Sequence, residues 1–300
     1  MCESAVTPST WRPARHARYH TAAMQVSRRA VLKALVASGL GGATGMLSHG
    51  YWYARHALQV VQVRLPVSGL APAHDGVRIG FLTDFHHSAL VSQADIARAA
   101  DLVMAAAPDL IVLGGDYVTN AQRAYMGGCA EALATLQAPA GVIAILGNHD
   151  DDRDMPAALA AQHFTVLRDA RTTVRLRGEM LDFVGVRFWT RQLSSIARLL
   201  GRSGATTIPL AHDPRRLIQA AHLAIPAVLS GHTHGGQVAF PGIGAIAARK
   251  FPVSAGLAVR DGTYLFVSKG VGTVYLPVRI NCPPDVAIVT LGRAGAQGEL

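Results

Sequence analysis

The sequence is short of cysteine and of charged side chains, and each shortage excludes a class of protein. Its three cysteines, Cys2, Cys129 and Cys282, are far apart and odd in number, so they build neither a disulfide framework nor a zinc knuckle. Only 16% of the 300 residues are charged and 50% are hydrophobic, which excludes a disordered chain. The length suits one large domain or two small ones and is ample for a sizeable core.

Acidic residues are almost absent from the first 56 positions. That segment holds seven Lys and Arg residues against the single acid Glu3, whereas residues 57–300 carry 21 basic and 18 acidic residues. The sequence pI near 10.0 is therefore mostly a property of the N-terminal segment. Because residues 57–300 have a net charge of only +3, they give little support for nucleic-acid binding, and we expect no nucleic-acid partner.

A long apolar run is also missing, but a shorter one follows a pair of arginines. The stretch SRRAVLKALVASGLGGATGML contains Arg28 and Arg29 and resembles a twin-arginine export signal. Its uncharged part, 34–47, is shorter than the ~20 residues of a typical spanning helix. The alternative is a cytosolic amphipathic helix with a basic end, although the glycines of this run disfavour a soluble helix.

We therefore interpret residues 1–56 as an N-terminal extension that carries an export signal or a membrane anchor. Extended through SHGYWY, the apolar run just reaches a spanning length, with its aromatic rings at the interface. We expect export by the twin-arginine machinery to the periplasm or the outer face of the cytoplasmic membrane. Residues 30–53 are the candidate anchor if the signal is retained.

From about residue 57, short apolar runs alternate with helical patterns and no linker interrupts them. This alternation predicts one layered α/β domain over residues 57–300. Helices are expected at 93–107, 123–136 and 191–201, and a hairpin at 172–178 and 180–188. Further strands are expected at 58–65, 77–83, 109–115, 141–147, 207–210, 225–229, 236–240, 263–268 and 285–291.

Polar side chains that bind metals follow the apolar runs at their C-terminal ends. The runs are VRIGFLTDFHH, LIVLGGDY, VIAILGNHDD, TTIPLAHDP and AIPAVLSGHTHGG. In α/β sheets, ligands collect at the carboxyl ends of the strands. His232 and His234 lie two residues apart and point to one side of an extended chain, between glycines that leave room for a ligand. Taken alone, this pair also fits a hydrogen-bonded histidine pair in a polar turn.

The donor chemistry of these side chains indicates a first-row divalent metal. Carboxylate, amide and imidazole groups suit Mn, Fe or Zn rather than calcium or a thiolate site. A tetrahedral zinc site needs about four ligands, so the surplus fits two ions that share a bridging carboxylate. The candidate ligands are Asp84, His86, Asp116, Asn148, His212, His232 and His234.

The order of these motifs resembles the motif series of the calcineurin-like metallophosphoesterases. The series is D-x-H (84–86), G-D (115–116), G-N-H-D (147–150), a lone His212 and G-H-x-H (231–234). With the tail FVSKGVGT...PVRINCPPDVAIVTL, the resemblance extends over nearly all of residues 57–292. It points to an exported branch that includes UDP-diacylglucosamine hydrolase-like enzymes, and it implies a four-layer α/β/β/α sandwich with mixed sheets.

The resemblance also implies a role for each motif residue. The ligands of the first ion would be Asp84, His86, Asp116 and His234. Those of the second ion would be Asp116, Asn148, His212 and His232, so that Asp116 bridges. His149 matches the catalytic histidine of the family and Asp150 its orienting partner. Many members have G-D-x-x-D where this chain ends in Thr119, a position that is not a ligand in the family, so we expect altered support around the site.

The implied reaction is hydrolysis of a phosphodiester or pyrophosphate bond by a metal-bridging hydroxide. A protonated His149 would stabilise charge on the phosphoryl oxygens or donate to the leaving group. Mn is the favoured metal, with Fe, Zn and Mg as alternatives, and a lipid-linked or nucleotide-linked phosphoester at the membrane is the expected substrate class. The alternative is a surface-tethered binding protein whose metal site is structural or inactive, a hypothesis that the retained His149 disfavours.

Overall fold

The apolar runs form two six-stranded sheets in the computed structural model, which describes residues 28–201 and 204–294. The first sheet has the order β1-β12-β2-β3-β4-β5 and the second β10-β11-β9-β8-β7-β6. The strands of the first are β1 (Gln59–Val67), β12 (Asp285–Arg293), β2 (Arg78–Leu82), β3 (Leu110–Leu113), β4 (Val142–Ala144) and β5 (Thr165–Val166). Those of the second are β10 (Gly256–Arg260), β11 (Thr263–Val267), β9 (Ala227–Ser230), β8 (Thr206–Ala211), β7 (Glu179–Val186) and β6 (Ala170–Leu176).

Both sheets are mixed, but the strands that precede the polar motifs are parallel. In the first sheet β2, β3, β4 and β5 run parallel, and β12 pairs with β2 in the antiparallel sense. In the second sheet β7, β8, β9 and β11 run parallel, and β6 and β10 are antiparallel edges. The carboxyl ends of parallel strands share one edge of each sheet. The polar motifs come directly after these strands, so they lie at that edge.

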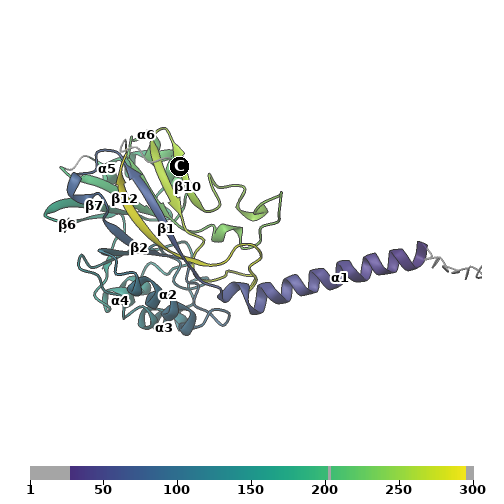
Figure 1. The fold of residues 1–300 in the computed structure, drawn as a ribbon. Helices are drawn as coiled ribbons and strands as arrows, with labels where there is room; N and C mark the ends of the chain where they lie inside the picture. Colours follow the sequence, from purple (N-terminus) through teal and green to yellow (C-terminus); the bar gives the residue numbers. More distant parts are fainter. Residues whose placement is uncertain (1–27, 202–203, 295–300) are drawn as a thin grey trace, which may run out of the picture. The chain divides into compact units, whose positions relative to one another are not determined.

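Helices cover the outer face of each sheet and complete four layers (Figure 1). The helices α2 (Gln93–Ala105), α3 (Met126–Ala132) and α4 (Asp154–Ala160) pack on the first sheet, and α5 (Leu193–Leu200) and α6 (Arg216–His222) on the second. A third apolar cluster lies between the sheets and includes Phe81 of β2, Phe183 of β7 and Phe266 of β11. The expected α/β/β/α sandwich with mixed sheets is confirmed.

Local sequence accounts for the start of α2 and for the burial of β3. Ser92 accepts a hydrogen bond from the backbone of Asp95, and the Asp95 carboxylate accepts one from the backbone of Ser92, which makes a capping box. The strand β3 reads LIVL without alternation and is buried throughout, as expected of a parallel strand covered on both faces.

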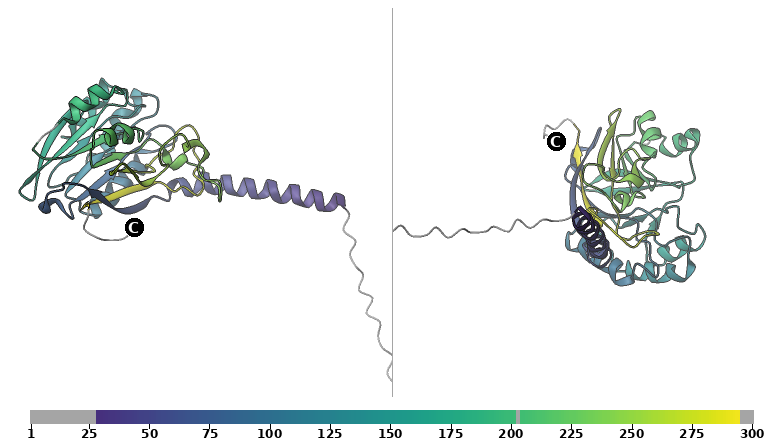
Figure 2. Two further views of the ribbon diagram at one scale, coloured as in Figure 1. Left: turned by 90° about the horizontal axis from the view of Figure 1, so that it is seen from above. Right: turned by 90° about the vertical axis from the view of Figure 1, so that its right-hand side faces the viewer.

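The helix α1 (Arg28–Trp52) contains most of residues 30–53, the segment in which an anchor was expected. Within the described part of the chain, no helix is both long and apolar enough to span a membrane. The contacts divide the chain between Ala43 and Thr44, so the last turns of α1 belong to the larger unit (Figure 2). Residues 1–27 of the expected N-terminal extension lie outside the described residues.

Two expectations about the elements are wrong or incomplete, and several elements were not expected at all. Residues 236–240 form no strand and follow an irregular path, because Gly236 and Gln237 have left-handed backbone that breaks the extended chain. The helix expected at 123–136 is shorter, with a 3-10 turn, η3 (Arg123–Tyr125), before α3. The sequence analysis missed α4, α6, β5 and β10, and the short 3-10 turns η1 (Ala54–His56), η2 (Pro72–His74), η4 (His234–Gly236) and η5 (Ile246–Ala248).

Candidate metal centre

The polar motifs of both sheets meet at one place. Asp84 and His86 follow β2, Asp116 follows β3, and the two histidines of the GHTH motif follow β9. Two groups of three side chains result, and within each group the ligand atoms lie within 4.8 Å of one another. The first group is Asp84, His86 and His234, and the second is Asp116, His212 and His232.

Asp116 lies between the two groups. Its Oδ2 is 3.0 Å from Nε2 of His212 in its own group and 3.4 Å from Nε2 of His86 in the other. In the first group, Nε2 of His234 is 3.1 Å from Nε2 of His86 and 3.3 Å from Oδ1 of Asp84. One carboxylate thus touches both sets, which is the arrangement that a bridging ligand requires.

The backbone at these positions is held in an uncommon conformation. Asp84, His86, Asp116, His232 and His234 all have φ between 50° and 73°. Side chains other than glycine rarely adopt this left-handed region, and it persists only where the surrounding structure enforces it. Five of the six grouped residues share this feature. The fold therefore fixes the direction in which each of these side chains leaves the main chain.

Neighbouring glycines make room for the carboxylates. A Cβ added at Gly147 would clash with the carboxylate of Asp116, and one at Gly231 would clash with that of Asp84. Both glycines precede motif residues, in GNHD and GHTH. Their role is therefore close packing against the carboxylates, whereas the glycines around the histidine pair were expected to leave room for a ligand.

The buried charges perturb one another strongly. Burial would raise the pKa of Asp116, but His212 and His86 hold it well below its usual range. Burial lowers the pKa of His212, yet Asp116 and Asp84 raise it to about 10. Burial, reinforced by neighbouring cationic groups, lowers the pKa of His232 to about 3 and that of His234 well below its usual value. The last two rings are therefore neutral and can offer lone pairs.

These residues fit two divalent cations. The six grouped side chains supply two carboxylates and four imidazoles, and all except the partly buried His232 are buried. Asn148 adds a buried Oδ1 that accepts no hydrogen bond from the described residues. A buried carbonyl oxygen without a partner requires an explanation, and a metal ion beside Asp116 and His212 would supply one.

Groups behind the ligands hold the imidazole rings. Nδ1 of His86 is 3.2 Å from the hydroxyl of Thr119, and Nδ1 of His212 donates to the carbonyl of Gly114 over 2.8 Å. In both rings Nε2 faces the other grouped side chains, and Nε2 of His212, which the raised pKa keeps protonated, would release its proton when a metal binds. Thr119 therefore supports a ligand from the position where many family members carry an aspartate.

Within the described residues, the hydrogen bonds of Asp150 come from the main chain, whereas its expected role was to orient the ring of His149. Its carboxylate accepts hydrogen bonds from the backbone N–H groups of Asp116, Tyr117 and Gly147 over 2.7 to 2.8 Å. The ring of His149 is contacted instead by the backbone N–H of Asn120, which lies 3.1 Å from Nδ1. Asp150 thus ties together the loops after β3 and β4, and its hydrogen bonds fix the main chain at Asp116 rather than the ring of His149.

The surroundings of His149 favour a neutral ring, whereas the sequence led us to expect a protonated one. Because Nδ1 accepts the N–H of Asn120, the ring of His149 carries its proton on Nε2. Burial lowers the pKa of His149 below its usual value, and the neighbouring His86 and His212 lower it further against the effect of Asp116. Both the hydrogen bond from Asn120 and the lowered pKa favour the neutral form of His149, with Nε2–H as a hydrogen-bond donor.

A cavity of about 670 Å³ opens beside the second group and His149. One side is polar, and the other is formed by Phe240, Ile246 and Leu276 together with Tyr275, whose ring stands edge-on to that of His149 at 5.7 Å. Tyr275 has φ of 59° and is 72% exposed. The sequence analysis missed this residue, and a tyrosine in a KGVGTVY turn carries no signal that marks it.

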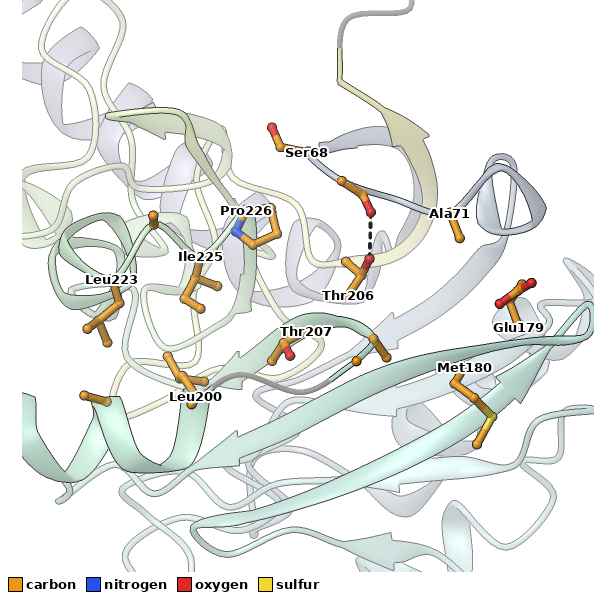
Figure 3. Close-up of a pocket in the computed structure, with 16 residues that line it drawn as sticks. Ser68, Ala71, Glu179, Met180, Leu200, Thr206, Thr207, Leu223, Ile225 and Pro226 are labelled. Atoms are coloured by element: carbon orange, nitrogen blue, oxygen red, sulfur yellow. Dashed lines mark hydrogen bonds between the residues drawn. The ribbon is translucent and has the colours of Figure 1, made fainter.

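A second cavity of about 650 Å³ lies at the opposite ends of β8 and β9 (Figure 3). Thr206, Thr207 and Pro226 line it, and the hydroxyl of Thr206 donates to the carbonyl of Gly69 over 3.0 Å. Among the described residues that line it, Glu179 is the sole charged side chain. The described residues of this lining bring together no group of carboxylates and imidazoles like those beside the first cavity, so the first cavity is the candidate site.

The geometry of this site defines a class of metal-dependent hydrolase, and comparison with known proteins gives the family. Residues 77–236 match the model of the calcineurin-like phosphoesterases, and the chain belongs to this family. It is therefore a metal-dependent phosphoester hydrolase.

Several relatives support this assignment. The chain is 27% identical to the uncharacterized metallophosphoesterase YkuE of Bacillus subtilis, over 89% of this chain and 98% of the relative. It is 30% identical to the phosphodiesterase YaeI of Escherichia coli, over 71% of this chain and 82% of the relative. An uncharacterized metallophosphoesterase of Aquifex aeolicus is 30% identical over 75% of this chain and 88% of its own length.

Proposed function

We propose that this chain is a dimetal phosphodiesterase that hydrolyses a phosphodiester or pyrophosphate bond of an amphiphilic, lipid-linked substrate. The observation that carries the proposal is the pair of buried ligand groups joined by Asp116, with His149 beside them. Asp84, His86, Asp116 and His234 would hold one ion, and Asp116, Asn148, His212 and His232 the other. Mn suits this mixture of carboxylate, amide and imidazole donors.

Two divalent ions, when bound, supply the positive charge that polarises a phosphoryl group and activates a water for in-line displacement. The protein contributes rigid placement of the ligands through left-handed backbone at five positions. It also contributes a donor, since Nε2–H of the neutral His149 can bond a phosphoryl oxygen as charge develops there. Asp150 holds the loops that carry Asp116 and His149 at a fixed separation.

The cavity wall supports the lipid-linked substrate class. Phe240, Ile246 and Leu276 line the cavity that also contains His149 and Asp116, and Lys250 stands with them. A small polar phosphoester would leave these apolar side chains in water, whereas an acyl or other apolar group next to the phosphate would cover them. Lys250 would pair with a further negative charge of the substrate.

Metal removal tests the proposal. Protein stripped with a chelator should lose hydrolysis of bis-p-nitrophenyl phosphate, and added Mn²⁺ should restore it, because the residues of both groups need cations to act on phosphorus. Initial rates across Mn, Fe, Zn and Mg would rank the metals. A protein that binds two ions and hydrolyses neither phosphodiesters nor pyrophosphates would instead be a binding protein with an inactive metal site.

Export by the twin-arginine route is the second part of the proposal, and the pair Arg28 and Arg29 at the start of α1 supports it. The double substitution Arg28→Lys and Arg29→Lys should trap the full chain in the cytoplasm, because the machinery reads arginine rather than charge. Cell fractionation measures the distribution. The control Lys33→Arg leaves the pair intact and should be exported, and arrival of the double variant outside the cytoplasm would contradict the signal assignment.

A further inference from the structure

We propose that the mouth of the metal-site cavity is a docking surface for an anionic lipid bilayer. We call this surface the apolar rim and define it as Phe240, Ile243, Ile246, Tyr275 and Leu276. All five side chains are exposed although they are apolar or aromatic. The inference concerns binding to a surface, so it does not depend on which phosphoester the site hydrolyses.

A tight turn exposes Ile243, one of the apolar side chains of the rim. In the sequence FPGIG, Phe240 and Gly244 exchange backbone hydrogen bonds of 3.1 and 2.8 Å, and Gly242 and Gly244 have φ of 75° and 76°. Ile243 lies at the tip of this turn and is 55% exposed. Turn tips favour polar residues and glycine. A well-defined turn that exposes an isoleucine to solvent therefore indicates a binding surface.

Cations stand directly beside this tip. The guanidinium of Arg249 donates to the carbonyl of Ile243 over 3.1 Å, which braces the turn and places a positive charge next to the isoleucine. Lys250 follows, and both basic side chains are exposed. The rim therefore pairs apolar tips with cations, the combination by which interfacial segments enter the headgroup region.

Carboxylates are missing from the segments that build the rim. Residues 231–260 and 262–284 contain no Asp or Glu, and the same holds for residues 28–52 of α1. A surface made to bind a protein or a second copy of this chain would be expected to mix both signs of charge around its apolar part. A rim whose neighbouring charges are all positive is instead complementary to anionic lipid headgroups, which attract Lys and Arg near the membrane surface.

The rim is continuous with the last turns of α1, which belong to the same unit. Gly50 accepts a hydrogen bond from the backbone of Arg279, and its packing leaves no room for a Cβ beside Val278. Ile280 in turn pairs with Val238, just before the FPGIG turn. Within the larger unit, the loops of the rim therefore lie beside the C-terminal end of α1 (Figures 1 and 2).

Exposed apolar side chains occur on those last helical turns as well. Met46, Leu47 and Trp52 of α1 are exposed, and so is Tyr53, which follows the helix. Surface apolar residues scattered singly need no explanation, but a group of them around one cavity indicates a binding surface. A bilayer that covers the rim would also lie over the mouth of the metal site.

Binding of the full-length chain to vesicles tests the proposal. Co-sedimentation would compare vesicles of phosphatidylglycerol and phosphatidylcholine in equal parts with vesicles of phosphatidylcholine alone. We expect binding to the anionic vesicles that weakens with added salt, because screening reduces the attraction of Arg249 and Lys250. Ile243→Asp should lower the vesicle partition coefficient by at least about tenfold, since an inserted isoleucine is lost and an acid is added.

A matched control separates this effect from general surface hydrophobicity. Val259 is 60% exposed and pairs with Tyr264 at the far end of β10, away from the metal groups. Val259→Asp should bind vesicles like the unchanged protein, and neither variant should lose hydrolysis of a soluble phosphodiester. Because α1 is present in every protein compared, its own contribution cancels.

Two results would overturn the proposal. If Ile243→Asp and Val259→Asp bind anionic vesicles equally well, the rim does not dock. If the unchanged chain is a dimer by light scattering and Ile243→Asp makes it monomeric while vesicle binding stays the same, the rim is a contact between two copies of the chain.

Discussion

Asp116→Ala should remove most of the bound metal and essentially all phosphoesterase activity. The carboxylate lies 3.0 Å from His212 and 3.4 Å from His86, so its loss takes a ligand from both groups at once. Metal content by mass spectrometry and turnover of bis-p-nitrophenyl phosphate on one preparation measure the effect. Circular dichroism on the same sample shows that the sheets remain.

A second substitution distinguishes charge from shape at this position. Asp116 Oδ1 also accepts a hydrogen bond from the backbone N–H of His149 over 2.8 Å. Asp116→Asn can keep this bond and the volume, yet it loses the negative charge between the two sites, so it should still bind metal poorly. Near-normal metal content in Asp116→Ala would show that Asp116 is not the bridge.

His149→Ala should retain both metals and lose about 10²–10³-fold in kcat, the cost of removing one donor that bonds a developing oxyanion. The prediction takes His149 as a neutral Nε2–H donor, the form favoured by the N–H of Asn120 at Nδ1 and by the lowered pKa. A donor to a phosphoryl oxygen acts on every ester alike. The loss should therefore be similar for p-nitrophenyl and alkyl phosphodiesters.

Two outcomes would contradict this role. Loss of a metal ion from His149→Ala would show that the ring is a ligand. A loss of activity that nearly disappears for the p-nitrophenyl ester would show that His149 acts as a general acid for the leaving group. His222→Ala is a suitable control, because His222 is exposed at the end of α6 and belongs to neither metal group.

The sequence predicted the positions of most strands. It also predicted that the carboxylate and imidazole side chains of the two groups lie close together. Both predictions depend on local patterns. Apolar runs such as LIVL form strands that are buried on both faces, and the donors follow at their carboxyl ends. The meeting of Asp84 with His234 and of Asp116 with His212 then follows from parallel strands that end at one edge. Whether these groups bind the ions assigned to them stays a prediction.

Features that depend on the folded main chain could not be predicted. Asp150 bonds the amides of Asp116, Tyr117 and Gly147, which come together only when β3 and β4 pair. The donor to Nδ1 of His149 is likewise a backbone group, that of Asn120. Residues 236–240 alternate like a strand, yet the left-handed backbone at Gly236 and Gln237 overrides the pattern.

The left-handed backbone at five of the six grouped residues has a consequence for metal preference. A left-handed φ fixes the direction in which each Cβ leaves the main chain, just after β2, β3 or β9. The separation of two bound ions would then depend on how these three strands are spaced. Phe81, Phe183 and Phe266 pack between the two sheets and hold their strands at a fixed spacing. This packing would therefore help to set the distance between two bound ions, although none of the three rings belongs to the grouped residues.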